Sequence, residues 1–329
     1  MKLALTVVLC FSACATDDLP PPDVTARIDC DTWACGTNSP TVGDGLVFDE
    51  LDSSGRPNAS GLAIVGAYTA DHTPIQLSVK RDVLSGTSAW GRVYQGLALV
   101  GTIIKLHRAS GGDYELLLAR YNETSFWAGN PKAVPFFEIQ ARKAGDQKFT
   151  EYACKYDALT DDPYWTSIRH SAVVFEGDHY DPVLKTVVDT YGSTVFNVAC
   201  AGTTPAKLHL LRHTNAGAWD LSTGLRLYPT TVAVRQTMLK LLTADYCGTG
   251  VSYTVDGTPL AYADSTGSWW MPGTTTEAIW GPSGAICLDT GRYLLPTSIA
   301  CSLPACPDFA DWSAYGEAMS ENRLPTPVP

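Results

Sequence analysis

The chain has 329 residues, of which 45% are hydrophobic and 17% charged, and its formal net charge is −11. This length and apolar content support one large domain or two smaller ones, and they exclude a largely disordered chain. The negative charge argues against nucleic acid as a partner, because such binders need excess Lys and Arg facing phosphate. No apolar run after the N-terminus approaches the roughly 18 residues of a membrane-spanning helix.

The N-terminus is similar to a secretory signal peptide of the lipoprotein type, covering residues 1–13. Lys2 supplies a positive charge, residues 3–9 are apolar, and two small residues precede Cys14. In such signals the cysteine carries diacylglycerol and becomes the first mature residue, although Phe11 stands where Leu is usual. We therefore expect export and lipid anchoring at Cys14, in the bacterial outer membrane or at the cell surface. The alternative is a plain signal peptide and a periplasmic or secreted soluble protein.

Residues 14–40 are predicted to form a tether. They contain a run of three prolines at residues 20–22, and proline runs act as stiff, extended spacers. A lipid-anchored domain needs such a spacer to stand off the bilayer.

Residues 41–150 are predicted to form a β-rich N-terminal domain. Their apolar segments alternate or are rich in β-formers, and none shows a useful helical period. The SGGD sequence at residues 110–113 indicates a hairpin turn. The expected strands cover residues 62–68, 75–79, 96–107, 114–121 and 136–142. This pattern is typical of an antiparallel sandwich or barrel.

Residues 151–306 are predicted to form a second domain that continues in strands, two of them at 172–175 and 195–199. One medium helix over about 231–246 interrupts these strands; it begins after a Pro-Thr-Thr sequence and ends with Gly248 as a left-handed stop. Residues 307–329 are expected to form a short C-terminal helix over 308–319, where Phe309, Trp312 and Tyr315 have helical spacing, and a frayed tail. The predicted fold is thus mainly β, with one medium and one short helix, and it is stabilised by disulfides.

Eight cysteines remain in the mature chain if Cys14 carries lipid, and an even number in an exported protein indicates disulfides. They are Cys30, Cys35, Cys154, Cys200, Cys247, Cys287, Cys301 and Cys306. The short spacings favour Cys30–Cys35 and Cys301–Cys306 as local pairs. The other four allow three pairings, of which we favour Cys154–Cys200 with Cys247–Cys287. No C-x-x-C pair occurs, so a zinc site has little support, and we expect no metal.

The segment TADYCGTG, residues 243–250, resembles the motif of the ADYC domain, a bacterial family. The similarity covers much of residues 45–295, and its specific part is 243–292, which includes EAIW at 277–280 and GAICL at 284–288. The resemblance implies an exported bacterial protein and no particular activity. It also implies cysteines where this chain has Leu208 and Met238, as if one disulfide had been replaced by apolar packing.

The motif residues Ala244, Asp245, Tyr246, Cys247 and Gly248 suit the end of a helix. Asp245 would cap backbone donors, Tyr246 would pack its ring and pair its hydroxyl, and Cys247 would link the helix end to a strand. The alternative is that Cys247 is a reactive nucleophile, but no histidine lies near it in the sequence.

Aromatic and acidic residues of the second domain are candidate ligand contacts. Trp269, Trp270 and Trp280 would stack on sugars, and Glu277 with Asp264 would supply a carboxylate pair for glycoside chemistry. The alternative is that the aromatic side chains fill the core.

A second acidic group is formed by Asp44, Asp49, Glu50 and Asp52, which lack the spacing of a calcium loop. We expect a solvated acidic edge there rather than a cation site.

The function that these observations favour is an envelope lipoprotein acting as a binding or structural module. Its expected partner is a protein or glycan ligand in the envelope, with the membrane contacted through the lipid anchor only and no cofactor. The alternative is an exported hydrolase, with glycans as the candidate substrates, that uses Asp and Glu residues on loops.

Overall fold

The computed structural model describes residues 40–43, 45–126, 130–155, 170–190, 192–215, 218–219, 226–227, 229–254, 260–266, 269–270, 275–292, 299–307 and 309–322. The expected signal peptide, Cys14, the tether up to residue 39, Cys30, Cys35, Asp44 and the tail after residue 322 lie outside these residues. Within the described part of the chain, no helix has the length and apolarity needed to span a bilayer.

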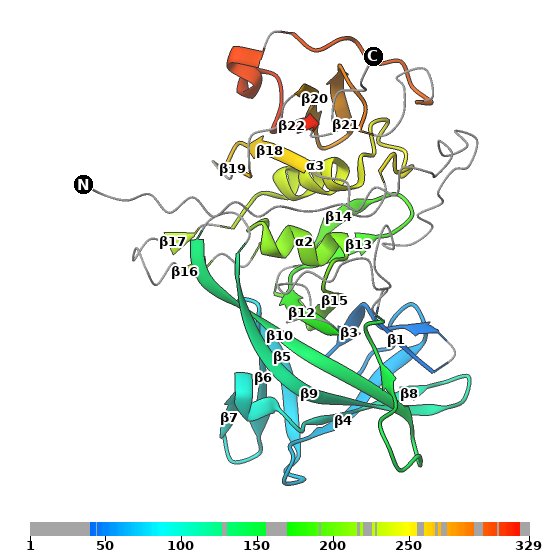
Figure 1. The fold of residues 1–329 in the computed structure, drawn as a ribbon. Coiled ribbons are helices and arrows are strands. Elements are labelled where there is room, and N and C mark those ends of the chain that lie inside the picture. The colour runs from blue at the N-terminus through cyan, green and yellow to red at the C-terminus, as the bar shows by residue number, and fades with distance from the viewer. Residues whose placement is uncertain are drawn as a thin grey trace, which may run out of the picture.

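The largest element is an antiparallel sheet of eight strands that curls into a nearly closed barrel (Figure 1). The two end strands, β3 and β4, lie in contact, which brings the sheet close to closure and protects its edges. The predicted antiparallel, barrel-like β fold is confirmed. In neighbour order the strands are β3 (Glu50–Asp52), β15 (Val195–Cys200), β12 (Ser171–Glu176), β10 (Asn130–Lys143), β9 (Asp113–Phe126), β8 (Ile103–Arg108) and β4 (Leu62–Tyr68), and β11 (Glu151–Tyr152) pairs with β10.

A smaller, three-stranded sheet packs against the eight-stranded sheet and shows the alternation of apolar and polar residues from which strands were predicted. In β5 (Ile75–Lys80), the side chains of Ile75, Leu77 and Val79 are buried and those between them are not. β5 pairs with β6 (Val83–Ser88), and β6 pairs with β7 (Val93–Gln95). Their apolar side chains join the core of the barrel. We refer to the eight-stranded sheet and this three-stranded sheet together as the barrel; a short ribbon of β1 (Thr41–Val42) and β2 (Leu46–Val47) flanks it.

The strand predicted over residues 96–107 is shorter than expected. Gly96–Leu99 form a 3-10 helix, η1, and β8 begins only at Ile103. Gly96 and Gly101 have positive φ angles of 53° and 87°, outside the strand region, and a Cβ at Gly101 would lie 2.7 Å from the Cβ of Ala70. The two glycines therefore divide the apolar run into a helical turn and a strand.

Strand β12 separates two hydrophobic cores. All six of its residues are buried, because both faces of the strand are covered. Ala172 and Val174 pack inside the barrel, whereas Val173 and Phe175 pack with the helices on the other side. The barrel therefore takes strands from both sides of the boundary at residue 150 that the sequence suggested.

The remaining elements form what we call the helical half, in which α2 (Thr204–Leu210) and α3 (Val232–Thr243) lie between the barrel and a five-stranded sheet (Figure 1). This sheet has the order β19 (Trp269–Trp270), β18 (Leu260–Asp264), β22 (Ala318–Asn322), β20 (Thr275–Gly281) and β21 (Gly284–Leu288). The helical half also contains two separate two-stranded hairpins: β13 (Asp178–Asp181) with β14 (Thr186–Asp189), and β16 (Ala218–Trp219) with β17 (Arg226–Leu227).

The medium helix is confirmed as α3, but its predicted end is wrong. Thr231 caps its start by accepting a hydrogen bond from the Val234 N–H at 3.2 Å. The helix ends at Thr243, and Ala244, with φ 49°, is the left-handed residue in place of Gly248. Helix α2 was not expected, because its seven residues are too few for a clear apolar period.

The predicted C-terminal helix over residues 308–319 is reduced to a 3-10 helix, η3 (Phe309–Ala314), followed by strand β22. Gly316 follows this helical turn. A Cβ at this position would lie 2.5 Å from the Ile279 side chain and 2.6 Å from the Trp280 carbonyl oxygen, so only glycine fits. The chain beyond it pairs with both β18 and β20, in the middle of the sheet. Tertiary pairing here overrides the helical spacing of the aromatic residues.

Three disulfides link the described residues. Cys154–Cys200 is confirmed, but the expected Cys247–Cys287 and Cys301–Cys306 pairs are wrong: the bonds are Cys247–Cys301 and Cys287–Cys306. The Leu288 N–H donates to the Pro304 carbonyl at 2.9 Å, so the segment containing Cys301 and Cys306 runs beside β21. Each of its cysteines therefore bonds to a different element rather than to its sequence neighbour. The disulfides indicate an oxidising environment, as in exported proteins.

Candidate functional site

The C-terminus of α3 shapes the ADYC segment. The Asp245 N–H donates to the Lys240 carbonyl at 2.9 Å, and the Ala244 N–H donates to the Leu241 carbonyl at 3.1 Å. This pair of bonds around a left-handed residue is the Schellman motif, which turns the chain sharply out of a helix. The turn aims the next two side chains, those of Asp245 and Tyr246, into the molecule, where they are completely or almost completely buried.

Asp245 forms a buried ion pair with Lys240. Its Oδ2 accepts hydrogen bonds from Lys240 Nζ at 2.6 Å and from the Gly250 N–H at 2.8 Å. Lys240 Nζ also donates to the carbonyl oxygen of Leu184 at 2.7 Å, on the β13–β14 hairpin. Asp245 thus closes the loop that follows it and, through Lys240, fixes this loop to a neighbouring hairpin.

Tyr246 reaches across the core to β20. Its hydroxyl donates to Glu277 Oε1 at 2.5 Å and accepts from the Arg292 N–H at 2.8 Å. Its ring stacks on Trp280, with centroids 5.1 Å apart. Burial, and secondly the negative charge of Glu277, raise the pKa of Tyr246 well above its ordinary value. The phenol therefore stays protonated and serves as a structural donor.

Arg292 completes this cluster. Its guanidinium contacts both oxygens of Glu277, with the Nη2–Oε2 distance 3.0 Å, and it also donates to the Leu241 carbonyl at 3.0 Å. The Leu241 carbonyl belongs to the last turn of α3, where a positive charge is favourable. Tyr246, Glu277 and Arg292 form the buried triad, which joins the helix end to the five-stranded sheet.

Cys247 and Gly248 attach the same turn at its surface. Cys247 is bonded to Cys301, so the structure holds no free thiol at the motif. Gly248 has φ 69°, and a Cβ there would lie 1.9 Å from the Ser283 carbonyl oxygen. Glycine is therefore required for the close approach of the β20–β21 turn rather than for ending the helix.

Among the residues singled out as ligand contacts, those whose side chains the structure describes, namely Trp280, Glu277 and Asp264, are buried. Trp280 is completely buried and its Nε1 donates to Ser320 Oγ at 2.8 Å. Glu277 belongs to the buried triad, and Asp264 Oδ2 lies 3.1 Å from His213 Nε2 with both side chains fully buried. Glu277 and Asp264 lie on β20 and β18, which β22 separates, and each has its own partner. Trp269 and Trp270 form β19, but their side chains lie outside the described part of the structure.

The acidic residues near the start of the barrel divide into two environments. Burial alone would raise the Asp52 pKa, but hydrogen bonds from Thr194, Ser54 and Arg56 outweigh it and lower the pKa to about 2. For Asp49 and Glu50 burial prevails and raises both pKa values, although His179, whose Nδ1 lies 2.6 Å from Glu50 Oε1, opposes it. The expected solvated acidic edge is wrong for Asp52, whose side chain is buried, and Asp49 and Glu50 are only partly exposed.

Asp49 and Glu50 line a small cavity that sequence reasoning did not find. Its volume of about 20 Å³ suits one water molecule or an ion of similar size. Its wall comes from five separate segments, so no local pattern could reveal it. The lining residues are Pro40, Asp49, Glu50, Tyr180, Asn197, Val198, Ala199, Thr203 and Pro205.

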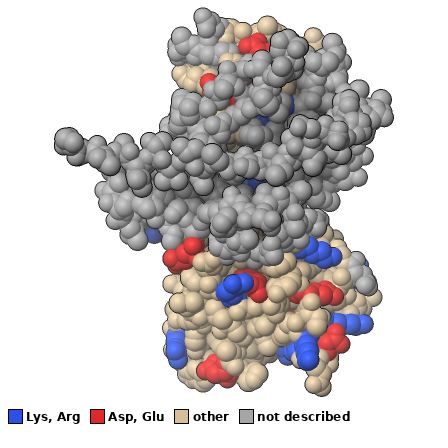
Figure 2. Space-filling model, viewed as in Figure 1, with Lys and Arg blue, Asp and Glu red and all other residues tan. Residues whose placement is uncertain are grey.

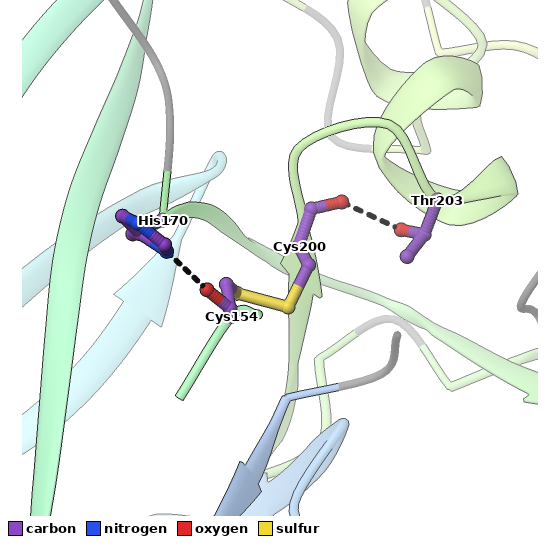
Figure 3. The surroundings of a disulfide bond; sticks show 4 residues. All are labelled: Cys154, His170, Cys200 and Thr203. Atoms are coloured by element: carbon purple, nitrogen blue, oxygen red, sulfur yellow. Dashed lines mark hydrogen bonds between the residues drawn. A yellow bond between two sulfur atoms is a disulfide. The ribbon is translucent and has the colours of Figure 1, made fainter. Parts of the chain in front are cut away.

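Cys200, which forms a disulfide with Cys154 (Figure 3), directly follows Ala199, one of the residues that line this cavity. Thr203, which lines the cavity, donates through Oγ1 to the Cys200 carbonyl at 2.8 Å, and His170 Nδ1 lies 2.9 Å from the Cys154 carbonyl. The disulfide therefore fixes the end of β15 and the entry to α2 on one side of the cavity.

The fold and the buried triad define a mainly β, disulfide-linked protein whose motif side chains are used in internal contacts. The family model of the ADYC domain matches residues 96–294, and the chain belongs to this family. No curated protein and no solved structure matches the chain. The matched region extends from η1 to just beyond Arg292, so it includes strands of the barrel as well as the helical half. At the two positions where the family resemblance implied cysteines, Leu208 and Met238 are fully buried in one core, on helices that pack together.

Proposed function

We propose that this chain is an exported bacterial envelope protein that acts as a binding or structural module. One observation carries the proposal: Asp245, Tyr246 and Cys247 are each used in a contact within the protein. A catalytic motif would instead direct a reactive group to a site that substrate can reach. The three disulfides, which indicate an oxidising environment, support the exported setting.

The proposal includes a lipid anchor at Cys14, in the outer membrane or at the cell surface. Mass spectrometry of the N-terminal peptide from protein made in a bacterial host tests it directly. We expect diacylglycerol on Cys14 and loss of membrane association in Cys14→Ala. An unmodified peptide that begins at another residue would support a periplasmic or secreted soluble protein instead.

Binding of an envelope glycan is tested with purified cell-wall sacculi. We expect the folded, oxidised protein to sediment with sacculi and to release no soluble fragments from them. Failure to sediment would direct the search to protein ligands in the envelope.

An exported hydrolase remains the second candidate, and one observation favours it. Asp49 and Glu50 are adjacent, line a cavity and have raised pKa values, as general acids do. Release of soluble fragments from the same sacculi, abolished in Glu50→Gln and retained in Glu138→Gln, would support hydrolysis at this place. Glu138 is a suitable control because it pairs with Arg120 on the barrel and does not line the cavity.

A further inference from the structure

The β6–β7 hairpin and the 3-10 helix η1 that follows it expose large apolar side chains. Trp90 is 83% exposed, Leu97 72% and Val93 56%. Trp90 lies on the turn between the two strands, Val93 lies on β7, and Leu97 lies on η1, which packs against β7. We call these three residues the hairpin patch. Single exposed apolar residues are ordinary, but three within residues 90–97 form a surface from which water is readily displaced.

The turn that carries Trp90 is closed by hydrogen bonds. The Gly91 N–H donates to the Ser88 carbonyl and the Ser88 N–H to the Arg92 carbonyl, both at 2.9 Å. The Arg92 N–H donates to Ser88 Oγ at 3.2 Å, and the Arg92 guanidinium lies 4.8 Å from the centre of the Tyr94 ring. The turn therefore presents Trp90 outward with an arginine beside it.

Charge distinguishes this patch from another exposed apolar pair, Val183 and Leu184. Both of their N–H groups donate to the Asp181 carboxylate at 2.8 Å, so a negative charge lies beside them. The sequence of residues 83–112 contains no Asp or Glu, although the whole chain has a net charge of −11. The charged side chains of that stretch are Arg92, Arg108 and Lys105, and Lys105 lies 4.0 Å from Glu115. At the η1 edge of the hairpin patch, the Glu123 carboxylate accepts from the hydroxyl of Tyr121, which lies beside Gly96, whereas Arg92 lies next to Trp90 at the other edge.

An apolar group with a cation beside it complements a surface of anionic phosphates above hydrocarbon. Tryptophan prefers this interface because its ring is apolar and its N–H is polar, and arginine binds phosphate. We propose that the hairpin patch rests on the phosphate-bearing surface of the bilayer to which Cys14 anchors the chain. The inference rests on the proposed lipid anchor and adds a second membrane contact to it.

The tether allows this contact without dictating it. About 25 residues separate Cys14 from Pro40, and at ~3.3 Å per extended residue they span up to ~80 Å. A domain of this size is roughly 50 Å across. Every face can therefore reach the bilayer, and surface chemistry selects the hairpin patch. Because the hairpin lies at the end of the barrel farther from α3, this orientation directs the helical half away from the membrane (Figure 1).

The test uses the full exported chain in vesicles of phosphatidylethanolamine and phosphatidylglycerol, with part of the lipid brominated near the headgroup end of its acyl chains. Subtracting the emission of Trp90→Phe from that of the wild type isolates the fluorescence of Trp90. The substitution is at an exposed position and leaves both cores intact. We expect the isolated emission to lose most of its intensity in brominated vesicles, and Leu97→Ser to reverse most of that loss.

Leu184→Ser is the matched control, since it removes an exposed leucine from the acidic patch and is expected to leave the quenching unchanged. Flotation of the vesicles separates the two proposals. If the chain does not float, the lipid anchor is wrong and the inference falls with it. If the chain floats but Trp90 is unquenched, only the inference is overturned, and a protein partner becomes the occupant to seek. Equal effects of Leu97→Ser and Leu184→Ser would also overturn it.

Discussion

The barrel and the helical half differ in how deeply their ion pairs are buried. In the barrel, Arg120, which pairs with Glu138, is 66% exposed, and even the least exposed pair of the described residues there, Arg142–Glu115, keeps side-chain exposures of 19% and 13%. In the helical half, both partners are buried in Lys240–Asp245, Arg292–Glu277 and Arg235–Asp178, with no side chain more than 3% exposed. Figure 2 shows charged side chains distributed over the surface of the barrel.

This difference means that the two regions are specified differently. The barrel depends on alternating apolar side chains, a non-directional interaction that tolerates changes in its surface charges. The helical half depends on particular pairs, since a buried charge without its partner is very costly. The stability of the helical half is therefore more sensitive to single substitutions.

Glu277→Gln is expected to give the largest effect. It leaves the buried Arg292 guanidinium without a counter-charge, at a cost of about 3–5 kcal/mol in the free energy of unfolding. Urea unfolding of the oxidised protein measures this cost. In the matched barrel variant, Glu138→Gln, Arg120 stays solvated, and a loss of at most about 1 kcal/mol is expected. Equal losses in the two variants would remove the distinction between the regions.

Removing the Cys247–Cys301 disulfide is expected to cost about 2–4 kcal/mol. The double variant Cys247→Ser with Cys301→Ser frees two residues 54 apart in the sequence, whereas Cys287 and Cys306 are 19 apart. Loop-closure entropy predicts that loss of the longer-range bond costs about 1 kcal/mol more. Thermal unfolding of both double variants checks the order, and the reverse order would show that local strain outweighs chain entropy.

Tyr246→Phe tests the difference between the two regions by removing a single buried hydroxyl from the helical half. The variant removes the donor to Glu277 and the acceptor of the Arg292 N–H, which is expected to cost about 1–3 kcal/mol. The barrel control is Tyr121→Phe. In the wild type, the Tyr121 hydroxyl donates to the exposed Glu123. A change within about 0.5 kcal/mol is expected there. Chemical denaturation of the pair decides whether burial, rather than the hydroxyl itself, sets the cost.

Asp52→Asn is expected to have the smallest effect, one that is present at neutral pH and disappears in acid. The folded-state pKa of Asp52 is about 2 against an ordinary 3.8, so the folded protein binds fewer protons than the unfolded chain between these values. Its contribution to stability is present above about pH 4 and is lost as the pH falls to about 2. The wild type should therefore lose stability more steeply than the variant in that window. Parallel acid-unfolding curves would contradict the pKa shift.

Local patterns predicted most of the barrel. Alternation identified strands at 62–68, 75–79 and 114–121, and the Gly-Gly turn marked the hairpin before β9. Helix α3 was also predicted, because its apolar residues repeat at helical spacing and Thr231 caps its start. These signals lie within a few residues of one another, which is why a sequence reveals them.

The helical half was less predictable because its contacts are long-range. Tyr246 meets Glu277 31 residues away, and Arg292 meets the Leu241 carbonyl 51 residues away. The motif alone predicted a helix end, a packed tyrosine and a bonded cysteine, but not the partners of these side chains. The same limit explains the two wrong disulfide pairs and the strand β22, whose neighbours β18 and β20 come from earlier in the chain.

The central claim is that the ADYC motif is a structural junction whose cysteine is permanently bonded. Site-resolved alkylation and mass spectrometry of the protein from its native host, before and after reduction, test it most directly. We predict that Cys154, Cys200, Cys247, Cys287, Cys301 and Cys306 are alkylated only after reduction, and that unreduced digests contain a Cys247–Cys301 linked peptide. Alkylation of Cys247 in the unreduced, folded protein would contradict the account and make a reactive thiol the function to pursue.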